Sequence, residues 1–139
     1  NSIPYMIDYL TAVLPATHPL AKADNLPFEQ LRGETFLLFP EHSFINDLCI
    51  RECRNAGFEP HIAYTGNRGA TLIDLVRNGA GITLMMHHSA RQENDSSLAF
   101  IPVTPGIYSY ISLNYAKEKP LSPQAESFVR YVKAHKRDF

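Results

Sequence analysis

The residues from His61 to His88 constrain the fold more than any other stretch of the chain. The segment opens on a short β-type run, residues 61–65, and continues through a turn-rich sequence, Thr-Gly-Asn-Arg-Gly. Apolar residues then recur three and four positions apart, which predicts a helix with one apolar face: Leu72, Ile73 and Val76. Gly79 ends this helix, because glycine takes the left-handed conformation without a Cβ clash. The apolar run 82–86 is typical of a strand buried on both faces, so we predict a strand–helix–strand crossover in a parallel sheet.

A second helix is predicted upstream, between two further strands. Residues 34–39 form a buried strand that Pro40 ends, and Ser43 is the natural N-cap of the helix that follows, because its hydroxyl can accept a bond from a first-turn amide. Gly57 ends that helix, and Pro60 prevents its continuation. The order from residue 34 to residue 86 is therefore β-α-β-α-β, which predicts an α/β fold.

The two ends of the chain carry simpler patterns. Residues 1–8 show little pattern, 9–14 predict a strand, and 26–33 predict one helical turn stopped by glycine. A polar loop at 89–97 precedes strands at 98–103 and 108–115. The last helix begins at Ser122-Pro123, a cap followed by a favourable first helical residue. Its predicted buried face consists of Ala125, Phe128, Val129 and Val132.

Composition excludes several classes of protein. At 139 residues, 45% apolar and 19% charged, the chain is about one globular domain's worth of sequence. A formal net charge of −1 gives no electrostatic drive towards nucleic acid. No apolar run approaches the roughly 20 residues that span a bilayer, so we expect no membrane association and no signal peptide. We interpret Cys49 and Cys53 as two reduced core thiols, which fits a cytoplasmic protein.

Five short motifs, taken in order, resemble a known family. They are His18-Pro19-Leu20-Ala21, Leu31-x-Gly33, Ala56-Gly57-Phe58-Glu59-Pro60, residues 75–84 (Leu-Val-Arg-Asn-Gly-Ala-Gly-Ile-Thr-Leu), and Leu121-Ser122-Pro123-Gln124-Ala125. Their order and spacing resemble the effector-binding, or substrate-binding, region of LysR-type transcriptional regulators. The resemblance covers the chain from about Tyr9 to its end.

The resemblance implies a fold similar to type 2 periplasmic binding proteins, in which two α/β subdomains joined by two crossover strands hold a small molecule in a cleft. Residues 1–25 would then be a crossover strand and lead-in, 26–104 the second subdomain, and 105–139 the return strand and C-terminal helix. We expect the winged helix-turn-helix and the first part of the first subdomain to be absent from this chain, so that DNA is bound only through the missing domain. The resemblance also implies a homodimer without enzymatic activity or cofactor.

Three segments are expected to meet at the carboxyl ends of the parallel strands, where α/β sheets bind ligands: residues 40–43, 65–68 and 86–88. The first two begin helices, whose free amides and positive dipole end suit an anion, so we predict a small organic acid or amino-acid-like effector. The candidate ligand-binding residues are Pro40, His42, Ser43, Thr65, Gly66, Asn67, Arg68, Met86 and His87. Competing readings are capping for Ser43, turn formation for Thr65 and Asn67, and plain solvent exposure for Arg68.

Three other functions remain possible from the sequence. His42, His87 and His88 could hold a metal, with Glu41 as base or Cys49 as nucleophile, although no metal-binding or catalytic spacing is present. A solute-binding module of the same fold, without a role in transcription, is a second alternative. The strand 108–115 and the last helix could also act mainly as assembly surfaces.

Overall fold

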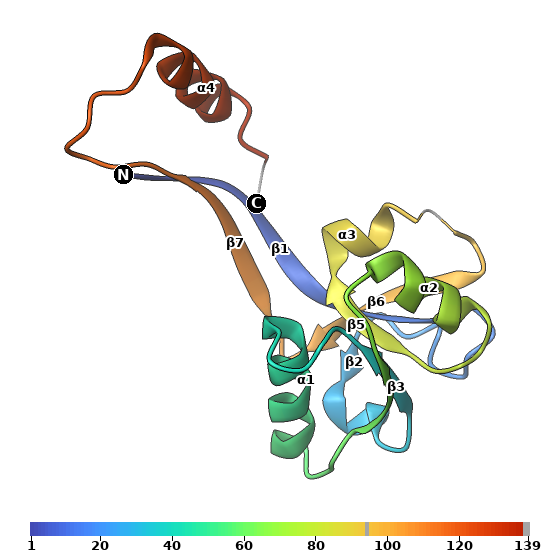
Figure 1. The fold of residues 1–139 in the computed structure, drawn as a ribbon. Helices are drawn as coiled ribbons and strands as arrows, with labels where there is room; N and C mark the ends of the chain where they lie inside the picture. The colour runs from blue at the N-terminus through green and yellow to red at the C-terminus, as the bar shows by residue number, and fades with distance from the viewer. Residues whose placement is uncertain (94, 138–139) are drawn as a thin grey trace. The chain divides into compact units, whose positions relative to one another are not determined.

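The computed structural model describes residues 1–93 and 95–137, and the chain divides into two compact units. Unit 1 comprises Asn1–Asp8 and Tyr108–Phe139, and unit 2 comprises Tyr9–Ile107. Strand β1 (Ser2–Pro15) contributes to both units (Figure 1). The assignment of residues 1–25, 26–104 and 105–139 to parts of a longer effector-binding domain stays a prediction.

The strands of unit 2 are joined in the order β4-β3-β5-β1-β6-β2. Strand β3 (Thr35–Leu38) pairs in parallel with β4 (His61–Thr65), and Phe36 bridges in parallel to Ile82, just before β5 (Thr83–Met86). On the other side, β5 pairs antiparallel with β1, β1 with β6 (Leu98–Thr104), and β6 in parallel with β2 (Leu26–Pro27). The predicted strand–helix–strand crossover is confirmed, with β3 lying between its two strands.

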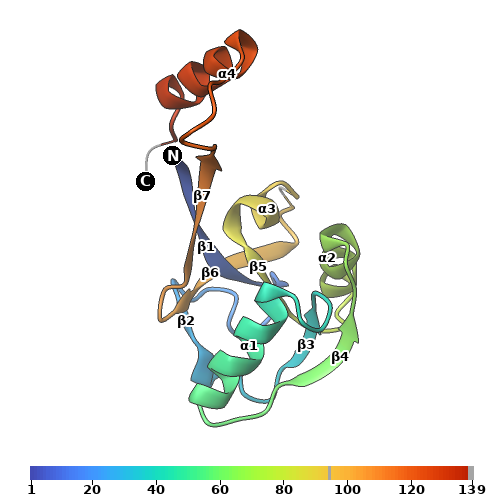
Figure 2. The same ribbon diagram turned by 60° about the vertical axis from the view of Figure 1, so that its left-hand side comes forward.

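Alternate residues of these strands face two different helical layers, as the two-residue period of a strand requires. Phe36, Leu38 and Leu84 pack with α1 (Phe44–Asn55) and the 3-10 turn η1 (Phe28–Leu31). Leu37 and Met85 pack instead with α2 (Gly69–Arg77) and α3 (His87–Arg91). Figures 1 and 2 show α1 on one side of the strands and the other two helices on the opposite side. Unit 2 is therefore a three-layer α/β/α arrangement.

Local chemistry fixes the two ends of α1 as predicted. Ser43 Oγ accepts a hydrogen bond from the amide of Asn46 at 3.3 Å, and Gly57 follows the helix with φ +91°. The Arg32 guanidinium donates to the carbonyl oxygens of Ala56 and Gly57, both at 3.2 Å. A cation near the C-terminal carbonyls of a helix is favourable for both hydrogen bonding and the helix dipole.

The His18-Pro19-Leu20 corner has a structural explanation. Nδ1 of His18 accepts a hydrogen bond from the Leu20 amide at 3.0 Å, so the proton of the neutral ring lies on Nε2. That nitrogen is 2.9 Å from Oε1 of Glu34, the residue before β3. The histidine thus ties the chain after β1 to the start of the next strand.

Unit 1 is small. The first residues of β1 pair with β7 (Tyr108–Asn114), and α4 (Pro123–Ala134) begins at Ser122, whose Oγ accepts from the Ala125 amide at 3.2 Å. Ile3, Val129 and Val132 are its buried core. The prediction that Phe128 is buried is wrong, because 56% of this residue is exposed to solvent in the described structure.

Two further sequence predictions need correction. Residues 1–8, which show little pattern in the sequence, belong to a strand, since β1 starts at Ser2 and pairs with β7, a partner too distant in sequence to be read from local pattern. The region 89–97 is not a simple loop, because α3 begins at His87 and so β5 does not continue through His87 and His88. Asn94, within that region, lies outside the described residues.

Across residues 1–93 and 95–137, none of the helices combines the length and the apolar character that crossing a membrane would need.

Candidate functional site

The ends of β3 and β4 lie side by side at one edge of the sheet. The amide of Gly66, directly after β4, donates to the carbonyl oxygen of Leu38, the last residue of β3, at 3.0 Å. Because the two strands are parallel, the segments that follow them leave from the same edge. Of the three segments expected to meet, two, residues 40–43 and 65–68, therefore start from the same edge.

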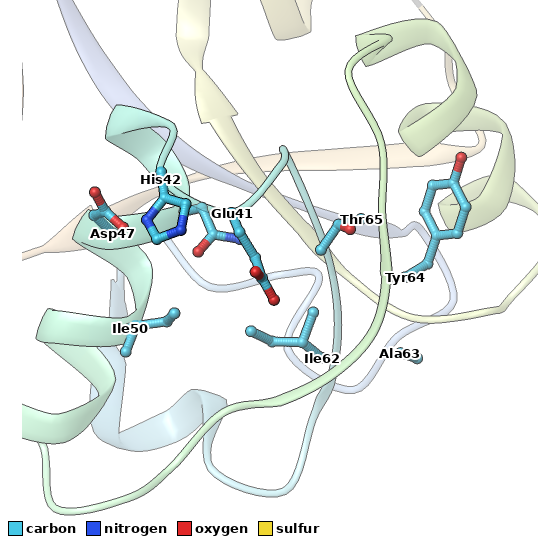
Figure 3. A pocket seen from close by; sticks show the side chains of 9 residues that line it. Glu41, His42, Asp47, Ile50, Ile62, Ala63, Tyr64 and Thr65 are labelled. Carbon is cyan, nitrogen blue, oxygen red and sulfur yellow. The ribbon is translucent and has the colours of Figure 1, made fainter.

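A hollow of about 420 Å³ opens between this edge and α1. Its lining residues come from the loop after β3, the first turns of α1, and β4: Glu41, His42, Asn46, Asp47, Ile50, Ile62, Ala63, Tyr64 and Thr65. Figure 3 shows Glu41 reaching from the α1 side towards Ile62 and Thr65, while the Tyr64 ring points away. The size suits a small molecule, since ligand pockets commonly measure roughly 300–1,000 Å³.

Asn46 is a polar residue of the hollow that sequence reasoning missed. It is only 1% exposed, and its Nδ2 donates to the carbonyl oxygen of Phe39 at 2.9 Å. This bond holds the end of the β3 segment against the start of α1. A signal was present in the sequence, because Asn46 precedes Cys49 and Cys53 by three and seven positions, the spacing of one helix face.

His42 has φ +67°, and it is the one non-glycine residue in the described chain with positive φ. Left-handed backbone is uncommon for a residue with a Cβ, and such positions occur often at functional sites. The unusual backbone lies at the turn between β3 and α1, and it places the exposed imidazole on the lining of the hollow.

The charges around the hollow are mainly negative. Glu41 and Asp47 are both exposed on its lining, and neither forms an ion pair or side-chain hydrogen bond with any residue in the described ranges. No lysine or arginine lines it, so His42 is the one lining side chain that can become positive.

Of the predicted ligand residues, the structure brings His42 and Thr65 to the hollow, and none of the other seven is on its lining. Pro40 precedes the lining segment, and Ser43 caps α1. Gly66 lies beneath the Tyr64 ring, where an added Cβ would come within 2.7 Å of that ring. Asn67 and Arg68 are exposed at the start of α2, outside the lining.

Met86 is the last residue of β5 and pairs with Leu10 of β1, and His87, the first residue of α3, also contacts β1. His87 Nδ1 lies 3.3 Å from Thr11 Oγ1, and its ring stacks on Tyr9 with centroids 4.3 Å apart. The structure therefore does not bring His87 together with His42. The ligand-binding roles of the nine residues stay predictions, and the lining favours those of His42 and Thr65 over those of Asn67 and Arg68.

The metal and nucleophile alternatives find no geometric support. The described residues contain no group of three or more His, Cys, Asp or Glu side chains placed to hold one metal ion. Cys49 and Cys53 are fully buried, and the hydrogen bond with Cys53, together with burial, raises the pKa of the Cys49 thiol. A thiol kept protonated in this way is a poor nucleophile.

Curated relatives of the chain are transcriptional regulators. The chain is 30% identical over 122 residues to the transcriptional dual regulator GltC of Bacillus subtilis, which covers 87% of this chain and 41% of that protein. It is 26% identical over 136 residues to the HTH-type transcriptional regulator YwbI of the same organism, which covers 97% of this chain and 45% of the relative. The chain thus spans less than half the length of these regulators, and the catalytic alternative gains no support from them.

Solved structures show the same fold. The regulatory domain of CcmR from Synechocystis PCC6803, in complex with 2-PG, matches with a TM-score of 0.82 at 19% identity, over 99% of this chain and 67% of that one. The effector-binding domain of QuiR, in complex with shikimate, matches with a TM-score of 0.77 at 20% identity, over 98% and 65%. The predicted α/β fold, similar to type 2 periplasmic binding proteins, is confirmed.

A family model for the LysR substrate-binding domain matches residues 1–137. With that match covering nearly the whole sequence, the chain belongs to the LysR substrate-binding domain family.

Proposed function

We propose that this chain is the effector-sensing part of a cytoplasmic LysR-type regulator, and that it binds a small organic acid or amino-acid-like compound in the hollow beside α1 and β4. The observation that carries the proposal is the position of this hollow, at the carboxyl ends of two neighbouring parallel strands. Open α/β sheets bind their ligands at such edges.

The mechanism that fits this site is a shift in population. An effector that binds one arrangement of the regulator better than another favours that arrangement by the difference in binding free energy. In a homodimer, the favoured arrangement would change how DNA-binding domains, supplied by another part of the regulator, meet their operator. The chain's own residues contribute binding and orientation, with no bond of the effector broken.

Two observations on relatives support sensing of a small molecule over solute binding without transcriptional control. The matched curated proteins are transcriptional regulators, and the CcmR and QuiR domains were solved with small molecules, 2-PG and shikimate. The lining residues of this chain are the guide to its ligand, because these two structures share only 19% and 20% identity with it.

A thermal-shift screen of small carboxylates and amino acids tests the proposal. A ligand that binds the folded state alone raises the melting temperature with its concentration. We expect a hit to be lost in Thr65→Val, which removes a hydroxyl from the lining, and kept in Asn67→Ala, which changes an exposed residue outside it. A hit that Thr65→Val leaves unchanged would move the site elsewhere, and the absence of any hit across the panel would contradict the proposal.

A further inference from the structure

We propose that the ligand of this hollow carries a protonated amino group, which the acceptor atoms of Glu41, Asp47 and Asn46 receive. This inference rests on the proposed function and narrows its ligand class, because it excludes a plain dicarboxylate or other purely anionic effector.

The charge of the lining favours a cationic group on the ligand. The carboxylates of Glu41 and Asp47 line the hollow, and no lysine or arginine on the lining offsets their negative charge. Like charges repel, so a purely anionic guest would be disfavoured, whereas a cationic group would be attracted. The positive end of α1 does not reverse this balance, because Asp47 lies in its first turn and Ser43 Oγ already binds one of its amides.

Asn46 gives the hollow a further hydrogen-bond acceptor besides the two carboxylates. Only 1% of this residue is exposed, and it lines the hollow. Its Nδ2 donates a hydrogen bond to the carbonyl oxygen of Phe39, and its Oδ1 accepts no hydrogen bond from residues 1–93 and 95–137. Oδ1 is not one of the buried side-chain atoms that lack a partner, so it keeps access to solvent beside the hollow and can accept a hydrogen bond from a donor on the ligand.

Most other carboxylates of unit 2 already have a basic side chain as partner. Glu34 contacts His18, Glu52 contacts Arg51, Glu59 contacts Arg54, and Asp74, Glu93 and Asp95 share Arg77. Glu41 and Asp47 lack one in the described structure, as do Asp24 and Glu29, which lie away from the hollow. The hollow therefore concentrates unpaired acceptors at one place.

The apolar part of the lining suits a short carbon chain. Ile50 on α1 and Ile62 on β4 both line the hollow, and Figure 3 shows them on opposite sides of it, below Glu41. Burial of methylene groups between two such side chains is favourable at roughly 0.8 kcal/mol for each group. A primary amine on a chain of a few carbons would thus satisfy both the acceptors and the aliphatic walls.

Four probes of matched length separate charge from size: butane-1,4-diamine, 4-aminobutanoate, succinate and butane-1,4-diol. We expect the melting temperature to rise with the two amines at concentrations up to roughly 10 mM, the range in which millimolar dissociation constants are visible. Succinate and the diol should leave it unchanged. The shift caused by the diamine should shrink with added salt, because exposed charges are screened.

Charge-removing variants place the effect on named residues. Glu41→Gln and Asp47→Asn keep the shape of the side chains, and each should weaken amine binding about twofold to fivefold, as is typical of exposed ion pairs. Asp24→Asn and Glu29→Gln are the matched controls, since both residues are exposed, unpaired in the described chain, and off the lining. Equal binding by all four variants would overturn the inference.

The outcomes also separate this inference from the proposed function. A shift with succinate and none with either amine overturns the amino-group inference and leaves an anion-sensing regulator standing. A shift with an amine that falls in Glu41→Gln supports both. No shift with either amine overturns the inference, and the wider metabolite screen then decides on the proposed function alone.

Discussion

Thr83 carries a buried hydroxyl that makes no hydrogen bond within the described chain. The residue lies in β5 opposite Val13 and is fully buried. A buried polar group without a partner loses its hydration and gains nothing in return. Because valine has nearly the shape of threonine without the hydroxyl, we expect Thr83→Val to raise the free energy of unfolding by about 1 kcal/mol. Urea unfolding of the two proteins measures the difference.

Thr11 is the matched control for this substitution. It is equally buried, on the neighbouring strand β1, but its Oγ1 lies 3.3 Å from Nδ1 of His87. Removing that hydroxyl removes this hydrogen bond to the imidazole, so Thr11→Val should lower the free energy of unfolding by about 1 kcal/mol. Two losses of similar size would mean that the Thr83 hydroxyl is satisfied in solution.

At this scale, sequence reasoning succeeds where a residue acts through its neighbours in the chain. Ser43, Gly57 and Gly79 were predicted from local chemistry and have the expected bonds or positive φ angles. Asn46 and the left-handed His42 were not predicted, because their conformations depend on how β3, α1 and β4 meet. Those two residues lie on the candidate site, where tertiary structure outweighs local preference.

Among the elements, the C-terminal end of α2 is tied to the segment before β6 by one arginine. Arg77 at the end of α2 forms an ion pair with Asp74 of the same helix, and its Nε lies 2.5 Å from Oδ2 of Asp95. The side chain and the amide of Ser97 also donate to Asp95, at 2.7 and 2.8 Å. These donors, Ser97 first and then Arg77, lower the pKa of Asp95 to about 2.

This pKa predicts how stability depends on pH. The carboxyl of an unfolded aspartate titrates near about 3.9, so the folded state holds the proton less tightly than the unfolded state. Asp95 therefore contributes stability that is present above about pH 4 and lost as the pH falls through about 2. We expect Asp95→Asn to have a smaller loss of unfolding free energy between about pH 5 and pH 2 than the parent chain. Urea unfolding at several pH values within this window measures both slopes.

Asp24→Asn is the control, because Asp24 is exposed and has no ion pair in the described residues. Its slope should match that of the parent chain. If Asp95→Asn also matches the parent, the contacts to Ser97 and Arg77 do not persist in solution.

Elements with a strong local signal were predictable, and those defined by distant partners were not. The helices α1, α2 and α4 have apolar stripes of helical spacing, α1 and α4 begin at a capping serine, and Gly79 follows α2; all three helices were predicted. The first half of β1 was missed because its partner β7 lies about a hundred residues away. Helix α3 was missed because it has five residues and no side-chain cap.

For the whole molecule, the two units differ greatly in the size of their cores. Within the described residues, unit 2 buries residues of nine helices and strands in two clusters on either side of its sheet, whereas unit 1 buries Ile3, Val129 and Val132. Large side chains of α4 are exposed in the described structure, with Phe128 at 56% and Tyr131 at 59%. Since tertiary packing supplies most of the stability of a short helix, the two units should differ in local stability.

Hydrogen exchange offers a direct test, because α1 and α4 are well matched. Both have 12 residues and both begin after a serine whose hydroxyl accepts from the third amide of the helix. They differ in burial: α1 packs Leu48, Cys49 and Cys53 into the larger core, and α4 packs two valines into the smaller one. We expect the central amides of α1 to be protected at least about tenfold more than those of α4, a difference that about 1.4 kcal/mol of local opening free energy produces. Equal protection of the two helices would show that the small core of unit 1 holds α4 as firmly as the larger core holds α1, and that exposure of Phe128 and Tyr131 does not weaken this helix.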